Sequence, residues 1–138
     1  MTLSHESLLF IASFCLLVSL LLAWLGALIL YGKIGFLKAI FPASHQLIRA
    51  HIDYLLMTGL LVVTYYMFEV RALEMPKAII LATCIGALYN PFGFIVLAIK
   101  PAMANPQTIL DKTRILVGFL PTTVGFGYAM GQVMMSFV

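Results

Sequence analysis

The stretch HQLIRAHIDY, residues 45–54, is the densest run of polar and ionisable side chains in a very apolar chain. It leads directly into residues 55–68, which carry no charge. With this lead-in the segment is long enough to cross a bilayer, because a spanning helix needs about 20 predominantly apolar residues. Ionisable side chains at the start of a membrane helix are costly, so this stretch is the first place to look for a function.

The overall composition is that of an integral membrane protein. Hydrophobic residues make up 63% of the 138 residues and charged residues only 9%, whereas a soluble domain carries about 25% charged residues. The net charge is +3, but the eight basic residues are spread over several loops. They do not form the basic patch that a nucleic-acid partner requires. We therefore expect one domain over residues 1–138, with the lipid bilayer as its first partner.

Four apolar segments predict an all-α, four-helix transmembrane bundle. The expected helices cover about residues 8–31, 50–70, 78–99 and 113–137. Their apolar runs are continuous, whereas transmembrane β-strands alternate apolar and polar residues over about ten positions. The connector between the first two helices is amphipathic, and Asn90-Pro91 is expected to interrupt the third helix because proline lacks a backbone donor.

The distribution of basic residues predicts the orientation in the membrane. Only Arg71 and Lys77 belong to the side that also holds both termini. The first and third loops hold the other six basic residues, namely Lys33, Lys38, Arg49, Lys100, Lys112 and Arg114. Cytoplasmic loops are enriched in Lys and Arg, so these two loops are predicted to be cytoplasmic and both termini external. The predicted location is the inner (cell) membrane, as a multi-pass protein.

The fourth segment contains Gly127-x-x-x-Gly131. Small residues at this spacing allow another helix to approach closely. A four-helix chain of this size has little interior of its own, so we expect a homo-oligomer. Cys15 and Cys84 lie in separate apolar segments and form no CxxC motif, which predicts packed, inert thiols rather than a redox pair.

Helical geometry separates the two ionisable residues at the centre of the opening stretch. His51 and Asp53 are two positions apart, which places them about 200° apart around a helix. Arg49 and Asp53 share one stripe and are predicted to form an i,i+4 ion pair. His51 lies on a mostly apolar stripe, where two interpretations remain open. It is an interfacial histidine bonded to a carbonyl or lipid head group, or it is a metal or haem ligand, since neutral imidazole is a good axial donor to iron.

The third segment carries a second polar candidate, Asn90. It precedes Pro91 and is either part of a simple kink or a polar group directed into a pocket. Tyr54 and Tyr89 offer further hydroxyl groups. His5 is expected to be solvated near the N-terminus. The sequence has no His-x-x-x-His motif or clustered Cys and His that would indicate a zinc site.

Three short motifs occur in order along the predicted helices. They are Arg49-Ala50-His51 at the start of the second, Gly86-Ala-Leu-Tyr-Asn90 in the third, and Pro121 followed by Ala129-Met130-Gly131 in the fourth. In order and spacing, over most of the chain, these motifs resemble the styrene oxide isomerase family of small four-helix membrane enzymes. The resemblance implies a homotrimer that holds haem b between subunits, with His51 as the axial iron ligand. It also implies that ferric iron acts as a Lewis acid on a small apolar epoxide and yields an aldehyde.

The resemblance weakens at the positions expected to contact substrate. Met57, Gly86 and Phe94 stand where the family has asparagine, aspartate and tyrosine. Asn90 is the polar residue that this chain retains, and Tyr54 is a candidate to replace a polar side chain that it lacks. These two are the predicted catalytic residues. The position of the haem ligand matches the family, whereas three positions on the substrate side do not. The alternatives are a small membrane transporter or channel subunit, and a non-catalytic subunit of a membrane complex.

Overall fold

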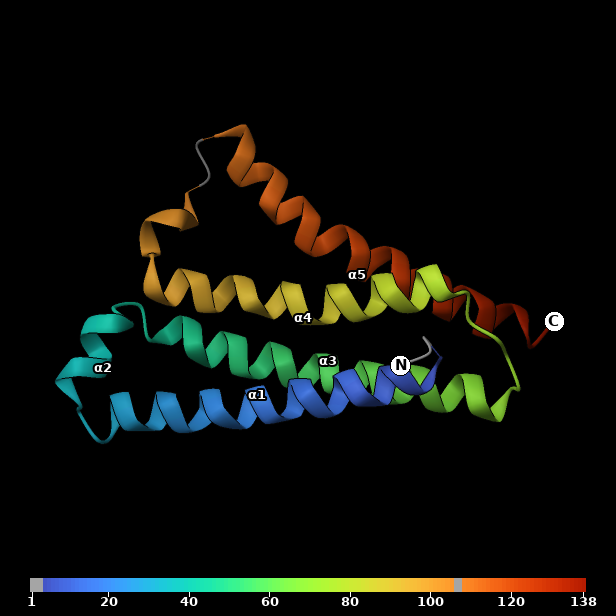
Figure 1. The fold of residues 1–138 in the computed structure, drawn as a ribbon, viewed down its shortest axis with the longest axis horizontal. Coiled ribbons are helices and arrows are strands. Elements are labelled where there is room, and N and C mark those ends of the chain that lie inside the picture. Colours follow the sequence, from blue (N-terminus) through green and yellow to red (C-terminus); the bar gives the residue numbers. More distant parts are fainter. Residues whose placement is uncertain (1–3, 106–107) are drawn as a thin grey trace.

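The computed structural model describes residues 4–105 and 108–138, apart from the side chains at positions 110, 111 and 114. Within these ranges the chain is all-helical, as predicted, and contains no strand. The elements are α1 (Glu6–Leu30), α2 (Gly35–Ile40), α3 (His45–Val70), α4 (Lys77–Ile99), the 3₁₀ helix η1 (Pro101–Ala104) and α5 (Ile109–Met135) (Figure 1).

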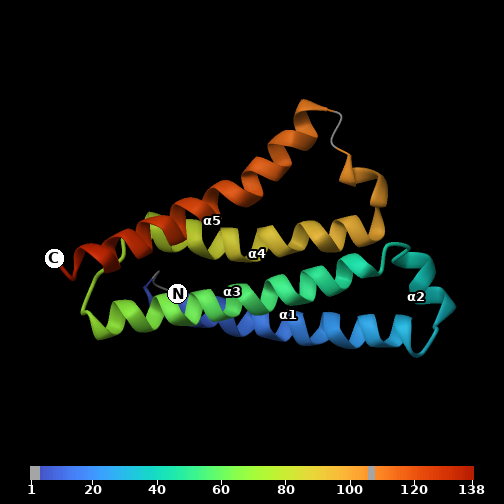
Figure 2. The same cartoon turned by 180° about the vertical axis from the view of Figure 1, so that it is seen from behind.

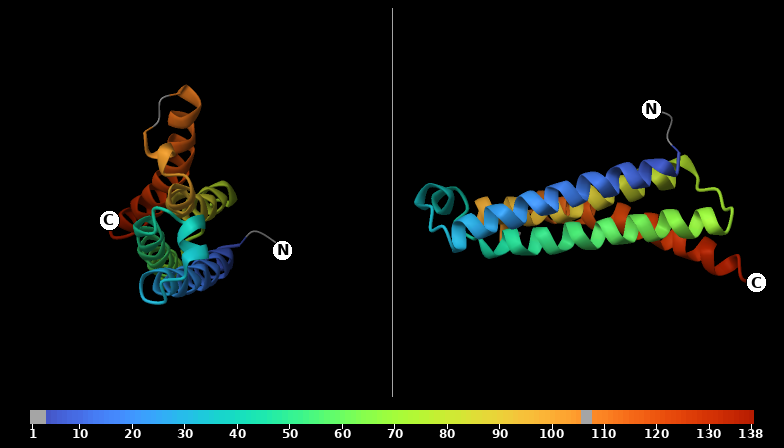
Figure 3. Two further views of the ribbon diagram at one scale, coloured as in Figure 1. Left: turned by 90° about the vertical axis from the view of Figure 1, so that its left-hand side faces the viewer. Right: turned by 90° about the horizontal axis from the view of Figure 1, so that it is seen from below.

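The long helices pack in chain order. α1 and α3 lie antiparallel side by side, and α4 packs along both (Figures 1 and 2). α5 crosses α4 at an angle, so that its first half diverges from the other helices (Figure 3). The short helices α2 and η1 lie at one end of the bundle, whereas the N-terminus, the α3–α4 connection and the C-terminus lie at the other. The loops predicted to share one side of the membrane therefore do share one end of the structure.

Among the described residues, three helices, α1, α3 and α4, are long and apolar enough to cross a membrane. α5 forms where a helix was predicted and has 27 residues, but it is not one of these three. Glycines, threonines, Pro121 and Gln132 dilute its apolar character. The structure therefore supports a membrane protein on three helices.

Two predictions about the helices need correction, the start of α3 and the interruption of α4. α3 begins at His45 rather than near Ala50, so the whole polar stretch is helical. α4 continues through Pro91 and is not interrupted there. Proline leaves the preceding turn short of a backbone N–H donor, but side chains of neighbouring helices can donate hydrogen bonds to its carbonyls instead. The Ala87 carbonyl accepts a weak hydrogen bond from Cys15 Sγ at 4.0 Å, and Tyr54 Oη donates to the Leu88 carbonyl at 3.1 Å.

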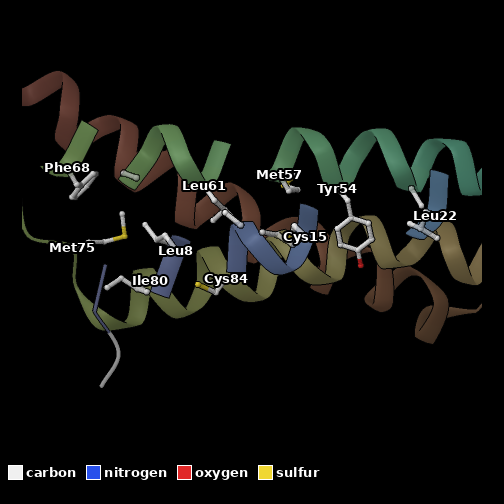
Figure 4. Close-up of a cluster of buried hydrophobic side chains, with 14 of the residues drawn as sticks. Leu8, Cys15, Leu22, Tyr54, Met57, Leu61, Phe68, Met75, Ile80 and Cys84 are labelled. Carbon is white, nitrogen blue, oxygen red and sulfur yellow. Dashed lines mark hydrogen bonds between the residues drawn. The ribbon is translucent and has the colours of Figure 1, made fainter. Parts of the chain in front are cut away.

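The interior is a single seam of side chains at helical spacing. The buried residues of α1 and of α3 recur three or four positions apart, and Figure 4 shows part of this seam. Both cysteines are buried and unpaired, as predicted. The outer faces are equally apolar, because Leu21, Trp24 and Leu56 are 69%, 70% and 58% exposed. Such surface suits contact with lipid rather than water.

The crossing of α4 and α5 is built on two glycines. A Cβ at Gly86 would lie 2.5 Å from the Thr122 backbone nitrogen, and a Cβ at Gly125 would lie 2.8 Å from the Thr83 backbone nitrogen. Each helix thus presents a Thr-x-x-Gly step to the other. The Gly127-x-x-x-Gly131 pair, predicted to mediate close packing, faces open space within the chain. Its role in contacts between subunits remains a prediction.

Polar contacts close the end of the bundle that holds the termini. His5 Nε2 lies 2.5 Å from Glu69 Oε1, and the His5 ring stacks on Tyr65 with centroids 5.7 Å apart. His5 is therefore paired rather than simply solvated. Arg71 bonds to Ser136 and lies over the Phe137 ring at 4.1 Å. These contacts hold the first turn of α1 and the end of α5 against α3.

Candidate functional site

His51 and Ser19 of α1 form a reciprocal pair of hydrogen bonds, called the Ser19–His51 clasp below. His51 Nδ1 lies 2.7 Å from Ser19 Oγ and 2.9 Å from the Ser19 carbonyl oxygen. Ser19 Oγ in turn lies 3.0 Å from the His51 carbonyl oxygen. Ser19 is completely buried, and His51 is half-buried in the second turn of α3. The two residues therefore fix the imidazole against the α1–α3 contact.

This clasp determines which imidazole nitrogen carries the proton. A carbonyl oxygen only accepts hydrogen bonds, so Nδ1 is the donor to Ser19 and the Ser19 hydroxyl donates to the His51 carbonyl. The neutral ring then carries its free lone pair on Nε2. No hydrogen bond to Nε2 occurs among the described residues. Metal-ligating histidines have this arrangement, in which one ring N–H bonds to a backbone carbonyl while the other nitrogen is available.

The surroundings of His51 are apolar and open. On α3 its neighbours Ile48, Ile52 and Leu55 are 41%, 50% and 40% exposed. His51 lines neither the cavity between α4 and α5 nor a second one between α3 and α5. The described residues contain no group of three or more His, Cys, Asp or Glu side chains able to hold a metal ion. The geometry therefore offers a single nitrogen ligand at an apolar surface, and not a metal site made of protein ligands alone.

The predicted ion pair between Arg49 and Asp53 is wrong. Asp53 Oδ2 instead accepts a hydrogen bond from Asn90 Nδ2 of α4 at 3.2 Å, while Arg49 is exposed. Spacing along α3 allowed the pair, but the rotation of α3 against α4 directs Asp53 towards the amide. A carboxylate at an apolar helix contact is stabilised by a fixed donor there.

Tyr54 is a packing residue in this structure. It is 4% exposed, and its hydroxyl donates to the Leu88 carbonyl. The ring lies in the seam of side chains that forms the interior (Figure 4). Tyr54 therefore joins α3 to α4 next to Pro91, and its hydroxyl is not among the lining groups of a described cavity.

Asn90 lines a cavity of about 440 Å³ between α4 and the diverging half of α5. Tyr89 is the other polar residue near it, and the remaining lining is mostly apolar. Among the described residues, the lining comprises Tyr89, Asn90, Phe92, Gly93, Phe94, Val96, Leu97, Met103, Ala104, Ile115, Gly118 and Phe119. Asn90 is thus a polar group at a pocket wall, in addition to its bond with Asp53.

One chain does not bring His51 and Asn90 together. His51 faces α1 through Ser19, whereas Asp53, about 200° away around α3, faces Asn90 on α4. The two candidate residues therefore bond to different partners, on different sides of α3.

The three departures from the isomerase pattern have structural explanations. Met57 is buried in the central seam, where an unpaired amide would be costly. At Gly86 the backbone of Thr122 occupies the space that any side chain would need. Phe94 lines the cavity one turn after Asn90, where it extends the apolar wall.

Sequence reasoning missed Ser19 and the contact between Asp53 and Asn90. The available signal for Ser19 was a hydroxyl near the middle of the uncharged run over residues 8–31, without an indication of its partner. No protein-family model matches this chain, and neither do curated proteins or solved structures.

Proposed function

We propose that this chain is a haem b-binding protein of the inner membrane and that His51 Nε2 is the axial iron ligand. The observation that carries the proposal is the Ser19–His51 clasp, which places the proton on Nδ1 and leaves Nε2 free. A buried hydrogen bond of this kind, from the nitrogen that does not bind the metal, orients a ligating imidazole and raises its basicity. The apolar surface around His51 suits a porphyrin.

The open position of His51 favours an oligomer. The apolar side chains around His51 are exposed, so a haem held there would need a second cover. A second copy of the chain provides one, in line with the homotrimer that the isomerase resemblance implies. In this proposal α5 is the fourth spanning helix, and the loops at the α2 end are cytoplasmic.

We further propose that the assembly isomerises small apolar epoxides to aldehydes. Bound ferric haem would supply a Lewis acid for this chemistry. The contribution of the chain is to hold and orient: His51 provides the ligand, the apolar helix faces exclude water, and Asn90 offers an amide at a pocket wall. Because His51 and Asn90 face different sides of one chain, the Asn90 involved would come from the neighbouring copy.

The first test is the visible spectrum of protein purified in detergent. We expect a Soret band that is lost in His51→Ala and retained in His45→Ala, an exposed histidine at the start of the same helix. Ser19→Ala keeps the ligand but removes its orienting hydroxyl, so haem affinity should fall by about 10–100-fold. A colourless wild-type protein, or a Soret band unchanged in His51→Ala, would exclude His51 as the ligand.

The isomerase proposal has a separate test. Haem-loaded protein is incubated with an aryl epoxide, and the aldehyde is quantified. Activity that is lost in His51→Ala and reduced in Asn90→Leu would support the assignment. Absence of aldehyde with a normal Soret band would remove the isomerase proposal and leave haem binding intact.

A further inference from the structure

The cavity between α4 and the first half of α5 has the properties of a small-molecule site. Its volume of about 440 Å³ lies within the range of about 300–1,000 Å³ that is typical of ligand pockets. Aromatic and aliphatic side chains such as Phe94, Leu97 and Ile115 form its walls. The cavity exists because α4 and α5 touch closely at Gly86 and Gly125 and diverge beyond that crossing.

The polar end of the cavity has a defined orientation. Asn90 Nδ2 donates to Asp53 Oδ2 at 3.2 Å. A carboxylate accepts hydrogen bonds, so it selects the nitrogen of the amide and directs the amide oxygen elsewhere. No described residue donates to Asn90 Oδ1. Asn90 lines the cavity, so its Oδ1, which has no donor from the described chain, is the acceptor available to a ligand there.

We infer that this cavity binds a small apolar molecule that carries a hydroxyl group, such as a phenol or an aryl alcohol. The hydroxyl donates to Asn90 Oδ1, and the ring occupies the apolar part of the cavity. Asp53 is a positioning residue, because it acts by orienting the amide. The inference is independent of haem, since Asp53 and Asn90 lie on the opposite side of α3 from the His51–Ser19 clasp.

The rim of the cavity indicates how such a ligand enters. Phe92 and Phe119, one on each helix, line the cavity and are 48% and 57% exposed. These side chains belong to apolar outer surfaces of α4 and α5, which suit contact with lipid. A ligand would therefore partition into the bilayer first and enter from the side. Phenols and aryl alcohols do so while keeping a hydrogen-bond donor, and epoxides and ethers offer only acceptors.

The test compares two fluorinated probes of similar size by ¹⁹F NMR with the full-length protein in lipid nanodiscs. 4-Fluorophenol has the hydroxyl donor, and 4-fluoroanisole replaces it with an ether. We expect the phenol to bind about tenfold more tightly once partitioning into empty nanodiscs is subtracted, as one added hydrogen bond in an apolar site allows. Equal affinities, or binding no greater than in empty nanodiscs because lipid fills the cavity, would overturn the inference.

Three variants identify the groups responsible. Asn90→Leu removes the acceptor, so both probes should bind with the same affinity. Asp53→Asn should reduce the difference in affinity between the phenol and the anisole, because a neutral amide at position 53 no longer fixes the orientation of the Asn90 amide. Arg49→Gln, one turn earlier on α3 and not bonded to Asp53, should leave the preference unchanged. An unchanged preference in both Asn90→Leu and Asp53→Asn would contradict the assignment.

The same measurement in His51→Ala separates this inference from the haem proposal. The phenol preference should persist in that variant, whether or not the protein is coloured. A preference that disappears only in His51→Ala would place the phenol at the haem ligand and would refute the cavity site.

Discussion

The close contact of α4 and α5 at Gly86 gives the sharpest prediction about this fold. In Gly86→Ala the new Cβ would lie 2.5 Å from the Thr122 nitrogen and 2.6 Å from its Cα. Carbon atoms pack favourably at about 3.5–4.0 Å, so the helices must separate locally by about 1 Å. Thr122 Oγ1 also lies 2.5 Å away, but the nitrogen and Cα belong to the backbone of α5, and a change of side-chain rotamer cannot remove them.

The expected magnitude follows from a matched control on the same helix. Gly93 also lies within α4, and a Cβ there would meet nothing within 4 Å. Both substitutions gain the same helix propensity, about 1 kcal/mol, whereas only Gly86→Ala incurs the overpacking cost of about 1–3 kcal/mol. The free energy of unfolding of Gly86→Ala should therefore lie about 1–3 kcal/mol below that of Gly93→Ala.

The two buried cysteines provide the assay. Cys15 on α1 and Cys84 on α4 are free and buried, so a maleimide dye reacts with them only after the helices separate. Labelling rates across a denaturant series in mixed micelles, together with circular dichroism, give the unfolding free energy of each variant. We expect Cys84, half a turn from Gly86, to become labelled at lower denaturant in Gly86→Ala.

Equal stabilities of Gly86→Ala and Gly93→Ala would refute the close crossing of α4 and α5. The double variant Gly86→Ala with Thr122→Ala is a second check. It removes the threonine hydroxyl but keeps the backbone contacts, so it should not restore stability. Full rescue would show that the side chain, and not the backbone, sets the helix separation.

Three further predictions follow, two tested by the same unfolding assay and one by protease digestion. Gly125→Ala should be less stable than Gly127→Ala by about 1–3 kcal/mol, because only the former Cβ meets α4 backbone; similar values would contradict the crossing. Tyr54→Phe removes one buried hydroxyl donor and should cost about 1 kcal/mol of unfolding free energy; no loss would mean that the α4 carbonyl has another donor. Arg71→Ala should change stability by less than about 1 kcal/mol, yet release Phe137 to faster carboxypeptidase trimming, seen by mass spectrometry against the wild-type chain.

Much of the architecture was predictable because apolar run length and charge placement act locally. A run of about 20 apolar residues must satisfy its backbone groups internally in lipid, so it forms a helix wherever it packs. The helices, the shared end of the basic loops and the burial of both cysteines followed from this reasoning. The start of α3 was placed too late, because the polar residues 45–49 lower the apolar signal without preventing helix formation.

The candidate site was predictable only in part. His51 and Asn90 stood out because ionisable and amide side chains are rare in this chain. The partners of these residues did not stand out. Ser19 is one hydroxyl in an apolar helix, and Asp53 seemed committed to Arg49 by its spacing along α3. The structure gave each a partner on a different helix, Ser19 with His51 and Asp53 with Asn90.

By itself the sequence determined that the chain is helical and suited to a membrane, and that His51 and Asp53 point in opposite directions. Helical periodicity decides which residues share a face. Only the tertiary structure decided what each face meets, because the rotation and pairing of helices depend on contacts distant in sequence. The close approach at Gly86 and Gly125 sets the angle of α5 and opens the cavity beside Asn90. The clasp on His51 Nδ1 likewise exists only because α1 and α3 pack together, and it leaves Nε2 free.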